Sequence, residues 1–446
     1  MLQSVPKLRH EPALAEQLPP LSAHDAAVEA NRCLFCYDAP CTHACPTHID
    51  IPRFIKKIAT GNLIGSARTI LEANILGATC ARVCPVQELC EGACVLGPSY
   101  KPIQIGRLQR YATDTVEPLR VLRVGPVSGR RAAVVGAGPA GLACAGYLAV
   151  NGCEVTLFER RTLGGGLSTY GIIALREPAE VALAEVEMIR GLGVTIREGV
   201  EFGRDIEWAE VRRRFDAVFL GVGLGATPAL GIPGEEHILD GIEYIERTKV
   251  DTGPIRIGKK VVVIGAGNTA IDCATIARRL GAEHVTMVYR RTDREMTAYA
   301  HEYDFVKREG VEVRFLAQPT RVVMRDGAVA GLECATVELG ALDESGRPAP
   351  HGVAGSEFVI EADQIVRAIG QVRPALVSLL GVETEKGLIR VNADFETSVP
   401  GVYAGGDCIR VKGAASTVMA VQDGKLAAMA IARALASTTK AVETHG

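Results

Sequence analysis

The sequence contains no uninterrupted apolar run that approaches the roughly 18 residues of a membrane-spanning helix. The opening residues MLQSVPKLRH lack the apolar core of a secretory signal peptide. The formal net charge of −3 leaves no surplus of positive charge for nucleic acid or an anionic membrane surface. We therefore expect a cytoplasmic protein with no nucleic-acid or membrane partner, in a compartment where thiols stay reduced.

Closely spaced cysteines are abundant. Four soft thiolates on a small sphere are what an iron–sulfur cubane requires, so two cysteine runs favour 4Fe-4S clusters. Zinc sites use two Cys-x2-Cys pairs, of which this region has only one, and reduced thiols argue against disulfides. Eight of the thirteen cysteines form the runs Cys33-x2-Cys36-x4-Cys41-x3-Cys45 and Cys80-x3-Cys84-x5-Cys90-x3-Cys94.

A first glycine-rich motif, Gly136-Ala-Gly138-Pro-Ala-Gly141, follows an apolar strand and opens a helix. Its glycines let the backbone approach a pyrophosphate at the helix N-terminus. The next strand ends in Glu159, an acceptor for ribose hydroxyls. Near the C-terminal end, Gly401-Val-Tyr-Ala-Gly-Gly-Asp407 ends another strand in two glycines and an acid, as in flavoproteins, although Asp407 also suits a helix N-cap. Together these segments predict an FAD-binding domain that the chain leaves and re-enters.

A second motif, Gly265-x-Gly267-x-x-Ala270, also follows a strand and starts a helix. Where an NAD site would place Asp or Glu after the next strand, the sequence reads Tyr289-Arg290-Arg291. Two guanidiniums suit a 2′-phosphate, so we expect NADPH, with NADH as the alternative if Glu295 or Glu302 accepts from the ribose. Cys273 in this fold lacks a Cys-x2-Cys partner, which argues against a thioredoxin-reductase-type dithiol reductase.

The length of 446 residues predicts two or three domains, and no repeat is visible beyond the two nucleotide folds. We expect an α/β chain in which an α-helical domain with two 4Fe-4S clusters precedes two Rossmann-like nucleotide-binding domains. The NAD(P)H-binding domain is inserted into the FAD-binding domain. The expected ranges are 1–125 for the iron–sulfur domain, 126–250 and 366–446 for the FAD domain, and 251–365 for the NAD(P)H domain.

The two cysteine runs, with their Cys45-Pro46 and Cys84-Pro85 steps, resemble the N-terminal part of dihydropyrimidine dehydrogenase. The resemblance extends from about Arg32 to Ala432, and the chain as a whole looks like the separate bacterial flavin and iron–sulfur subunit of that enzyme. Glutamate synthase small subunits are similar too. The resemblance implies one cluster on Cys33, Cys36, Cys41 and Cys94 and another on Cys45, Cys84, Cys90 and Gln109. Cys80 is then a spare thiol, whereas the spacing alone would have included it.

The same resemblance implies two sets of nucleotide contacts. FAD is expected to contact Gly136, Gly138, Pro139, Ala140, Gly141, Glu159, Leu167, Arg176, Gly223, Asp407, Thr417 and Val418. The pyridine nucleotide is expected to contact Gly267, Asn268, Thr269, Ala270, Arg290, Arg291, Ala368, Ile369 and Gly370.

Function follows from the same comparison. Two nucleotide folds and a cluster domain leave no room in this chain for the flavin-bearing barrel that reduces pyrimidines. The resemblance therefore implies an NAD(P)H-dependent oxidoreductase subunit, within a hetero-oligomer, that supplies electrons to an FMN-containing catalytic partner reducing uracil or thymine. The alternatives are a glutamate synthase small subunit or related reductase, and a metal-stabilised binding module without turnover. The cofactors carry the chemistry, so no catalytic acid or base is assigned.

Overall fold

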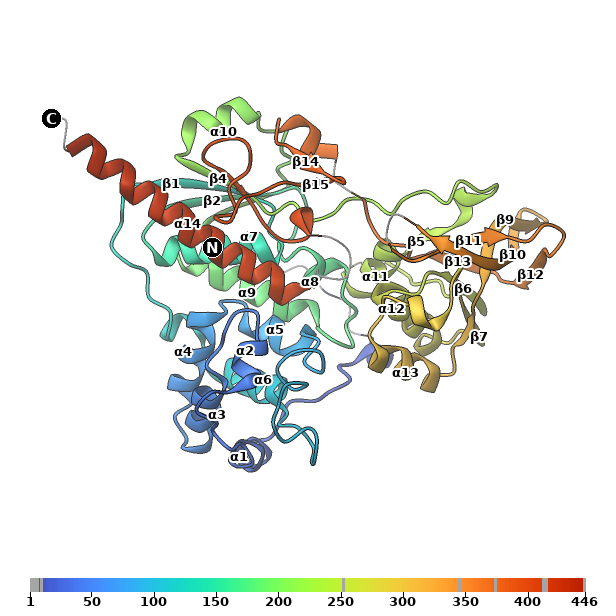
Figure 1. Cartoon of the computed structure of the whole chain (residues 1–446), viewed down its shortest axis with the longest axis horizontal. Coiled ribbons are helices and arrows are strands. Elements are labelled where there is room, and N and C mark those ends of the chain that lie inside the picture. The colour runs from blue at the N-terminus through green and yellow to red at the C-terminus, as the bar shows by residue number, and fades with distance from the viewer. Residues whose placement is uncertain are drawn as a thin grey trace. The chain divides into compact units, whose positions relative to one another are not determined.

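The computed structural model describes Leu8 and residues 11–250, 253–343, 346–372, 375–410 and 416–443 (Figure 1). The chain divides into two compact units. The flavin–cluster unit comprises Gln17–Thr169, Glu180–Leu224 and Arg373–Gly446. The pyridine unit comprises Met1–Glu16, Tyr170–Ala179 and Gly225–Val372. Within the described ranges, every helix is too short or too polar to cross a lipid bilayer.

The cysteine-rich segment is helical. Apolar side chains from four of its helices, including Ala26, Phe54, Ile70 and Leu108, form a small core beside Cys45 and Cys94. Short helices separated by turns bring the two cysteine runs back to this core. The helices are α1 (Ala23–Asn31), α2 (Pro40–Ala44), α3 (Ile51–Ala59), α4 (Leu63–Ala73), α5 (Gly77–Val83) and α6 (Ile105–Thr115).

The same unit contains a five-stranded parallel sheet in the order β16-β4-β1-β2-β3. Its central strand β1 is apolar on both faces, as a doubly covered parallel strand must be. The strands are β1 (Arg131–Val135), β2 (Glu154–Glu159), β3 (Thr195–Glu198), β4 (Ala217–Leu220) and β16 (Val402–Ala404). The surrounding elements are α7 (Pro139–Val150), α8 (Leu167–Tyr170), α9 (Ala179–Gly191), α10 (Trp208–Arg214), α14 (Thr417–Glu443), β14 (Thr384–Glu385) and β15 (Leu388–Ile389).

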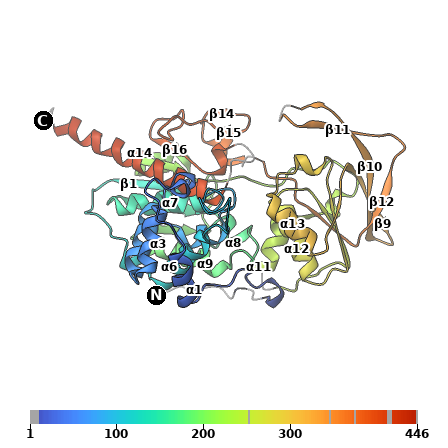
Figure 2. The same cartoon turned by 60° about the horizontal axis from the view of Figure 1, so that its bottom comes forward.

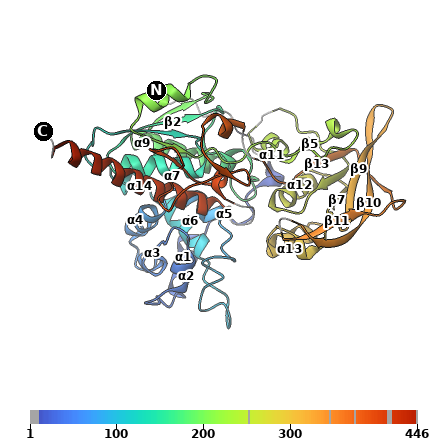
Figure 3. The same cartoon turned by 45° about the horizontal axis from the view of Figure 1, so that its top comes forward.

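Alternate residues of β1 face opposite layers. Ala132 and Val134 belong to the core that also holds α7, α9 and α14 side chains, whereas Ala133 and Val135 face the layer around Phe202. Helix α14 lies along α7 and also touches α5 of the cysteine-rich segment (Figure 3). Ile75, Leu76 and Cys80 therefore belong to the hydrophobic core of the sheet, whereas Cys45 and Cys94 belong to the separate core of the cysteine helices.

The pyridine unit is built on a second parallel sheet, in the order β5-β13-β6-β7-β8. Its central strand β6 places Val261 and Val263 against helices, and Val262 and Ile264 against an antiparallel sheet. Figure 2 shows α12 and α13 on one side and β9, β10 and β12 on the other. The elements are β5 (Leu239–Asp240), α11 (Gly241–Lys249), β6 (Lys260–Ile264), α12 (Asn268–Arg279), β7 (His284–Val288), α13 (Ala300–Arg308), β8 (Glu312–Arg314), β9 (Ala317–Arg325), β10 (Ala328–Leu342), β11 (Pro348–Gly352), β12 (Phe358–Glu361) and β13 (Gln364–Arg367).

The predicted domain boundaries differ from these units. The expected junction at 250/251 follows β5 and α11, but β5 pairs with β13 and α11 packs on α12, so both belong to the pyridine unit. The expected junction at 365/366 cuts through β13. Both boundaries depend on which short strands pair with each other. These strands are far apart in the sequence, so amino-acid composition could not predict the pairing.

One buried carboxylate, on helix α9, forms hydrogen bonds to helix α5 of the cysteine-rich segment. Glu185 of α9 accepts hydrogen bonds from the backbone N–H groups of Ala78 (2.8 Å) and Thr79 (3.3 Å) in the first turn of α5. The residue before α5, Leu76, provides no side-chain cap. Glu185 thus serves as the missing N-cap acceptor of the helix that precedes Cys84.

We expect Glu185→Ala to lower the free energy of unfolding by about 1–3 kcal/mol, because two buried N–H groups lose their charged acceptor. Urea unfolding of the full chain, followed by circular dichroism, measures this loss. The control is Glu187→Ala on the same helix, whose exposed side chain only pairs with Arg190. Equal losses in the two variants would contradict the capping role.

Candidate cofactor-binding sites

The predicted FAD residues gather at the carboxyl edge of the first sheet. Gly136 follows β1, Glu159 ends β2, Gly223 follows β4 and Asp407 follows β16. Strand β1 lies between β2 and β4. The strands that follow β1 in the sequence are therefore added first on one side of it and then on the other, which creates a topological switch point at the carboxyl end of β1. Ligands of open α/β sheets bind at this point.

The glycine-rich turn leaves no space for side chains. A Cβ at Gly141 would lie 1.9 Å from the Gly136 carbonyl oxygen, and Gly136 itself has a φ of 97°. Gly138 is the N-cap of α7, and its ideal Cβ would meet nothing nearer than 3.9 Å. The tight turn and the open backbone at Gly138 fit a pyrophosphate at the helix N-terminus.

Glu159 is buried, with 8 % of its surface exposed. Its carboxylate accepts from the backbone N–H groups of Ala137 (2.8 Å) and Arg161 (2.8 Å). These two bonds fix the carboxylate beside the glycine turn. Each oxygen keeps a further acceptor site, which suits a ribose hydroxyl.

Asp407 lies beside a buried ion pair on α14. Asp423 is fully buried and accepts from the Gly406 N–H (3.0 Å) and the Arg410 guanidinium (2.8 Å). Burial raises the pKa of Asp407, the adjacent Asp423 raises it further, and Arg410 opposes the shift. Thr417 and Val418 begin α14, close in sequence to this pair, and Leu167 begins α8.

The second glycine turn has the same architecture. Gly265 has a φ of 134°, and a Cβ there would lie 2.2 Å from the Ala368 carbonyl oxygen. The turn thereby lies against Ala368, the first residue of the segment Ala368, Ile369 and Gly370 that is expected to contact the nucleotide. Gly267 caps α12, whose first residues are Asn268, Thr269 and Ala270.

The Asn268 side chain supports a ligand at this turn. Its Oδ1 is buried and has no hydrogen-bond partner among the described residues. Buried amide oxygens are normally paired, so a bound nucleotide would supply the missing donor. The residues present therefore fit a dinucleotide.

The structure corrects the prediction for Arg291. Only 2 % of its surface is exposed, and its guanidinium donates to the Pro348 carbonyl (2.8 Å) and to Asp343 (2.6 Å). Arg291 therefore fastens the β10–β11 hairpin to the end of β7 and is not available to a phosphate. Sequence patterns could not identify Asp343 as its partner, because the two residues lie 52 positions apart.

Arg290 remains available as a phosphate ligand. Its side chain is exposed. Partial burial of the guanidinium lowers the pKa of Arg290, and the neighbouring Arg291 and Arg347 lower it further. Three arginines thus create a positive region at the end of β7, which favours an anion.

Arg176 also differs from its prediction as an FAD contact. It lies in the pyridine unit, where its guanidinium pairs with Asp272 (2.9 Å) and Glu302. Arg176 therefore occupies Glu302 Oε1, whereas the buried Oε2 of Glu302 has no hydrogen-bond partner among the described residues. Glu295, the other candidate ribose acceptor, forms a capping box with Thr292. NADH therefore stays the alternative coenzyme.

Cys33, Cys36, Cys41 and Cys94 are the ligands expected for the first cluster, and their thiols influence one another. Burial raises the pKa of Cys41 to about 11, and Cys33, Cys94 and Cys36 add to the shift. Cys33 in turn interacts with Cys36 and Cys94. These four thiols are mutual neighbours, and binding iron would remove their protons.

The second group contains Cys84 together with Cys80, Cys90 and Cys45. The Cys80 thiol is hydrogen-bonded to Cys84 and raises its pKa most, followed by burial. Gln109 is buried on α6, and its amide nitrogen donates to the Gly77 carbonyl at the start of α5 (2.8 Å). Both Cys80 and Gln109 thus lie on or against α5, and the fourth ligand of this group stays a prediction.

No three His, Cys, Asp or Glu side chains in the described ranges converge closely enough to hold a single metal ion. Thiolates are the usual ligands of the larger iron–sulfur cubane, so the two cysteine groups, the second completed by Cys80 or Gln109, have the donor chemistry for two 4Fe-4S clusters.

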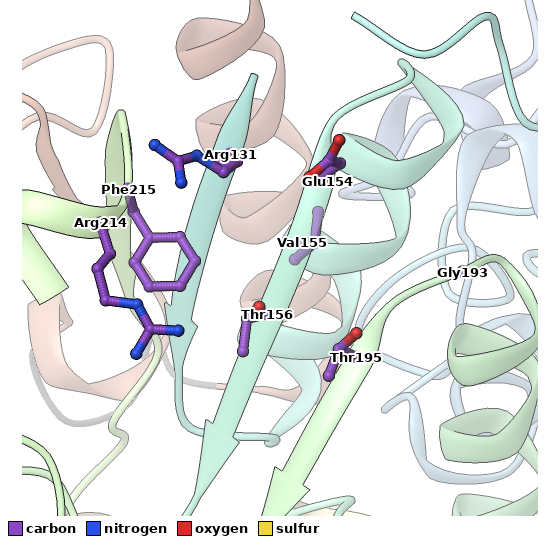
Figure 4. Close-up of a pocket in the computed structure, with 8 residues that line it drawn as sticks. All are labelled: Arg131, Glu154, Val155, Thr156, Gly193, Thr195, Arg214 and Phe215. Carbon is purple, nitrogen blue, oxygen red and sulfur yellow. The ribbon is translucent and has the colours of Figure 1, made fainter. Parts of the chain in front are cut away.

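A pocket in the flavin–cluster unit lies away from these sites. Figure 4 shows its lining, which includes Arg131, Glu154 and Thr195 at the amino ends of β1, β2 and β3. Nucleotides bind at the opposite, carboxyl edge of such sheets, so this pocket is not part of the FAD site.

Sequence reasoning missed three buried residues that organise the sites: Glu185, Asp423 and Lys425. Two of them, Asp423 and Lys425, flank Gly424 in an otherwise apolar stretch of α14. Charged residues on a buried helix face were a usable signal, because such residues are rarely buried unless they are paired.

Two family models match the chain. Residues 11–120 match the model described as dihydropyrimidine dehydrogenase domain II, 4Fe-4S cluster, and residues 130–424 match pyridine nucleotide-disulphide oxidoreductase. Glutamate synthase [NADPH] small chain of Escherichia coli is 35% identical over 92% of this chain and 91% of its own length. An NAD-dependent dihydropyrimidine dehydrogenase subunit PreT of Salmonella typhimurium is 33% identical over 94% of this chain and 96% of its own length.

A longer relative is the NADP(+)-dependent formate dehydrogenase subunit beta of Moorella thermoacetica. It is 37% identical over 88% of this chain, but the chain spans only 59% of its length. Among solved structures, T. acidophilum thioredoxin reductase has a TM-score of 0.54 at 23% identity, covering 68% of this chain and 99% of that chain. This likeness concerns the fold alone, and it confirms the Rossmann-like flavoprotein architecture.

The cysteine groups, the two glycine turns and these matches agree. The chain belongs to the family of iron–sulfur flavoprotein oxidoreductases that join a 4Fe-4S domain of the dihydropyrimidine dehydrogenase type to a pyridine nucleotide-disulphide oxidoreductase domain, and it is an NAD(P)H-dependent oxidoreductase with FAD and 4Fe-4S clusters as cofactors.

Proposed function

We propose that this chain is the cytoplasmic electron-input subunit of a larger reductase, accepting hydride equivalents from NADPH and delivering single electrons to a separate catalytic subunit. One observation carries the proposal: both cysteine groups and the FAD-type sheet belong to one compact unit, in which Cys80 and Cys84 pack against the core of the sheet. Such packing holds the cofactors at a fixed separation, which electron transfer requires.

The chain's own residues bind and orient the cofactors. Gly138 and the N-terminus of α7 would hold the FAD pyrophosphate, and Glu159 its ribose. Asn268 and Arg290 would hold NADPH, and the eight predicted ligands would hold two 4Fe-4S clusters. When bound, FAD converts a two-electron hydride into single electrons for the clusters.

We further propose that the catalytic partner is the FMN-containing barrel subunit of a dihydropyrimidine dehydrogenase, which reduces uracil or thymine. The dihydropyrimidine dehydrogenase subunit from Salmonella, similar along nearly its whole length, supports this partner. A glutamate synthase large subunit is the second candidate, because a glutamate synthase small chain is equally similar over 91% of its length.

Reconstitution distinguishes the two partners. We expect NADPH and uracil to yield dihydrouracil only when this chain is mixed with a candidate barrel subunit. Glutamate formation with a glutamate synthase large subunit, without dihydrouracil in the first mixture, would favour the second candidate. Dihydrouracil production by this chain alone would contradict the assignment of pyrimidine chemistry to a partner.

The predicted ligands can be tested by iron and acid-labile sulfide analysis of the anaerobically purified chain. We expect about eight of each per wild-type chain and about four after Cys84→Ser, because one cubane loses a thiolate. Cys80→Ser should retain both clusters, whereas Gln109→Leu should change the EPR spectrum of the second. The control is Cys144→Ser, a buried thiol on α7 outside both groups. If Cys80→Ser loses iron and Gln109→Leu does not, Cys80 is the fourth ligand of the second cluster and Gln109 is not.

The NADPH preference can be tested at Arg290. We expect Arg290→Gln to raise KM for NADPH about tenfold or more and to leave KM for NADH nearly unchanged, since only NADPH offers a 2′-phosphate. The charge-matched control is Arg325→Gln, because Arg325 is an exposed residue at the end of β9. Steady-state reduction of an artificial acceptor measures both constants. A similar rise for both coenzymes would remove Arg290 from phosphate recognition.

A further inference from the structure

A lysine of α14 reaches from the flavin side into the cysteine-rich segment. Only 9 % of Lys425 is exposed. Its ammonium donates to the backbone carbonyls of Thr47 (3.0 Å) and Ala73 (2.8 Å), which lie 378 and 352 positions away in the sequence. The ammonium also lies 6.0 Å from the ring centroid of Tyr147 on α7.

The Thr47 carbonyl belongs to the turn that carries Cys45. Cys45 is buried, and its Sγ is 3.4 Å from the Thr47 hydroxyl, which is also buried. Burial lowers the pKa of Lys425, and the Cys45 thiol opposes that shift. The ammonium is therefore held against the turn that carries a predicted cluster ligand, and its printed hydrogen-bond partners are two backbone carbonyls.

A buried charge is costly unless an opposite charge or several hydrogen bonds compensate it. Two carbonyl oxygens supply part of that compensation. A cubane held by thiolates is anionic, and each one-electron reduction adds one further negative charge. A fixed cation at its edge favours the reduced form, because net charge and local hydrogen bonds set cluster potentials.

We propose that Lys425 is a positioning residue that raises the reduction potential of the cluster bound by Cys45 and ties its loop to the flavin-binding helix α14. The step affected is the gain of one electron by that cluster, from its 2+ to its 1+ core state, with reduced FAD as donor and no proton bound. This inference rests on the proposed role of Cys45 as a cluster ligand.

Two variants separate the charge of Lys425 from its hydrogen bonds. Lys425→Gln keeps amide donors for the carbonyls but removes the charge, whereas Lys425→Arg keeps the charge. Lys57→Gln is the matched control, because Lys57 also joins two segments of the same region, donating to the Gly65 carbonyl (2.9 Å) and the Thr69 hydroxyl (2.7 Å). The charged groups that influence the pKa of Lys57 are Arg53, Glu72, Arg68 and Asp50, and burial lowers it most.

The measurement is a redox titration of the iron-loaded full chain, followed by EPR, with the second cluster identified by the signal that Cys84→Ser removes. We expect Lys425→Gln to disfavour reduction of that cluster at least about tenfold, a shift of about 59 mV to more negative potential. The Lys425→Arg and Lys57→Gln proteins should stay close to wild type, and the cluster on Cys33, Cys36, Cys41 and Cys94 should shift less in every variant.

An unchanged potential in an iron-replete Lys425→Gln protein would overturn the inference, as would an equal shift in Lys57→Gln. If Lys425→Gln fails to retain iron, Lys425→Met provides the neutral comparison. Loss of the Cys45-side cluster from both neutral variants, but not from Lys425→Arg, would support the charge requirement, and its loss from all three would contradict it. Wild-type protein without clusters would instead refute the proposed function itself.

Discussion

The close packing of α14 against α7 connects the parts of the flavin–cluster unit. At Gly424 a Cβ would lie 2.2 Å from the Ala140 carbonyl oxygen, so only glycine allows the two helices to approach this far. The residue before it, Asp423, accepts hydrogen bonds from the Gly406 N–H and the Arg410 guanidinium, next to Asp407. The residue after it, Lys425, holds two carbonyls of the cysteine-rich segment. Three consecutive residues thus join the FAD turn, the first nucleotide helix and the loop of Cys45.

This arrangement explains why polar groups are buried in an apolar core. Asp423 and Lys425 are each compensated by groups from distant parts of the chain, as is Glu185 through the first turn of α5. Partnered charges of this kind contribute little net stability, but they define one geometry because the partners are costly to separate. For a protein that conducts electrons, a defined separation between cofactors is the functional requirement.

The second nucleotide fold shows how similar residues acquire different roles. Arg290 and Arg291 are adjacent and chemically identical, yet one is exposed and the other almost completely buried. The buried arginine fixes the hairpin that carries Arg347, which contributes to the positive region beside Arg290. Arg291 therefore shapes the region beside Arg290 through its bonds to Pro348 and Asp343.

The sequence by itself determined the fold class and the two glycine turns, because these depend on short-range spacing of glycine and apolar residues, whereas the cluster ligand sets were expectations from the family resemblance. Only the tertiary structure decided the roles of Arg176 and Arg291, whose carboxylate partners come from remote segments. It also assigned β5 and α11 to the pyridine unit and placed Cys80 and Gln109 on or against the same helix. The physical reason is common to all of these cases: spacing along the chain fixes local geometry, whereas the partner of a buried charge or an edge strand depends on which distant segments pack together.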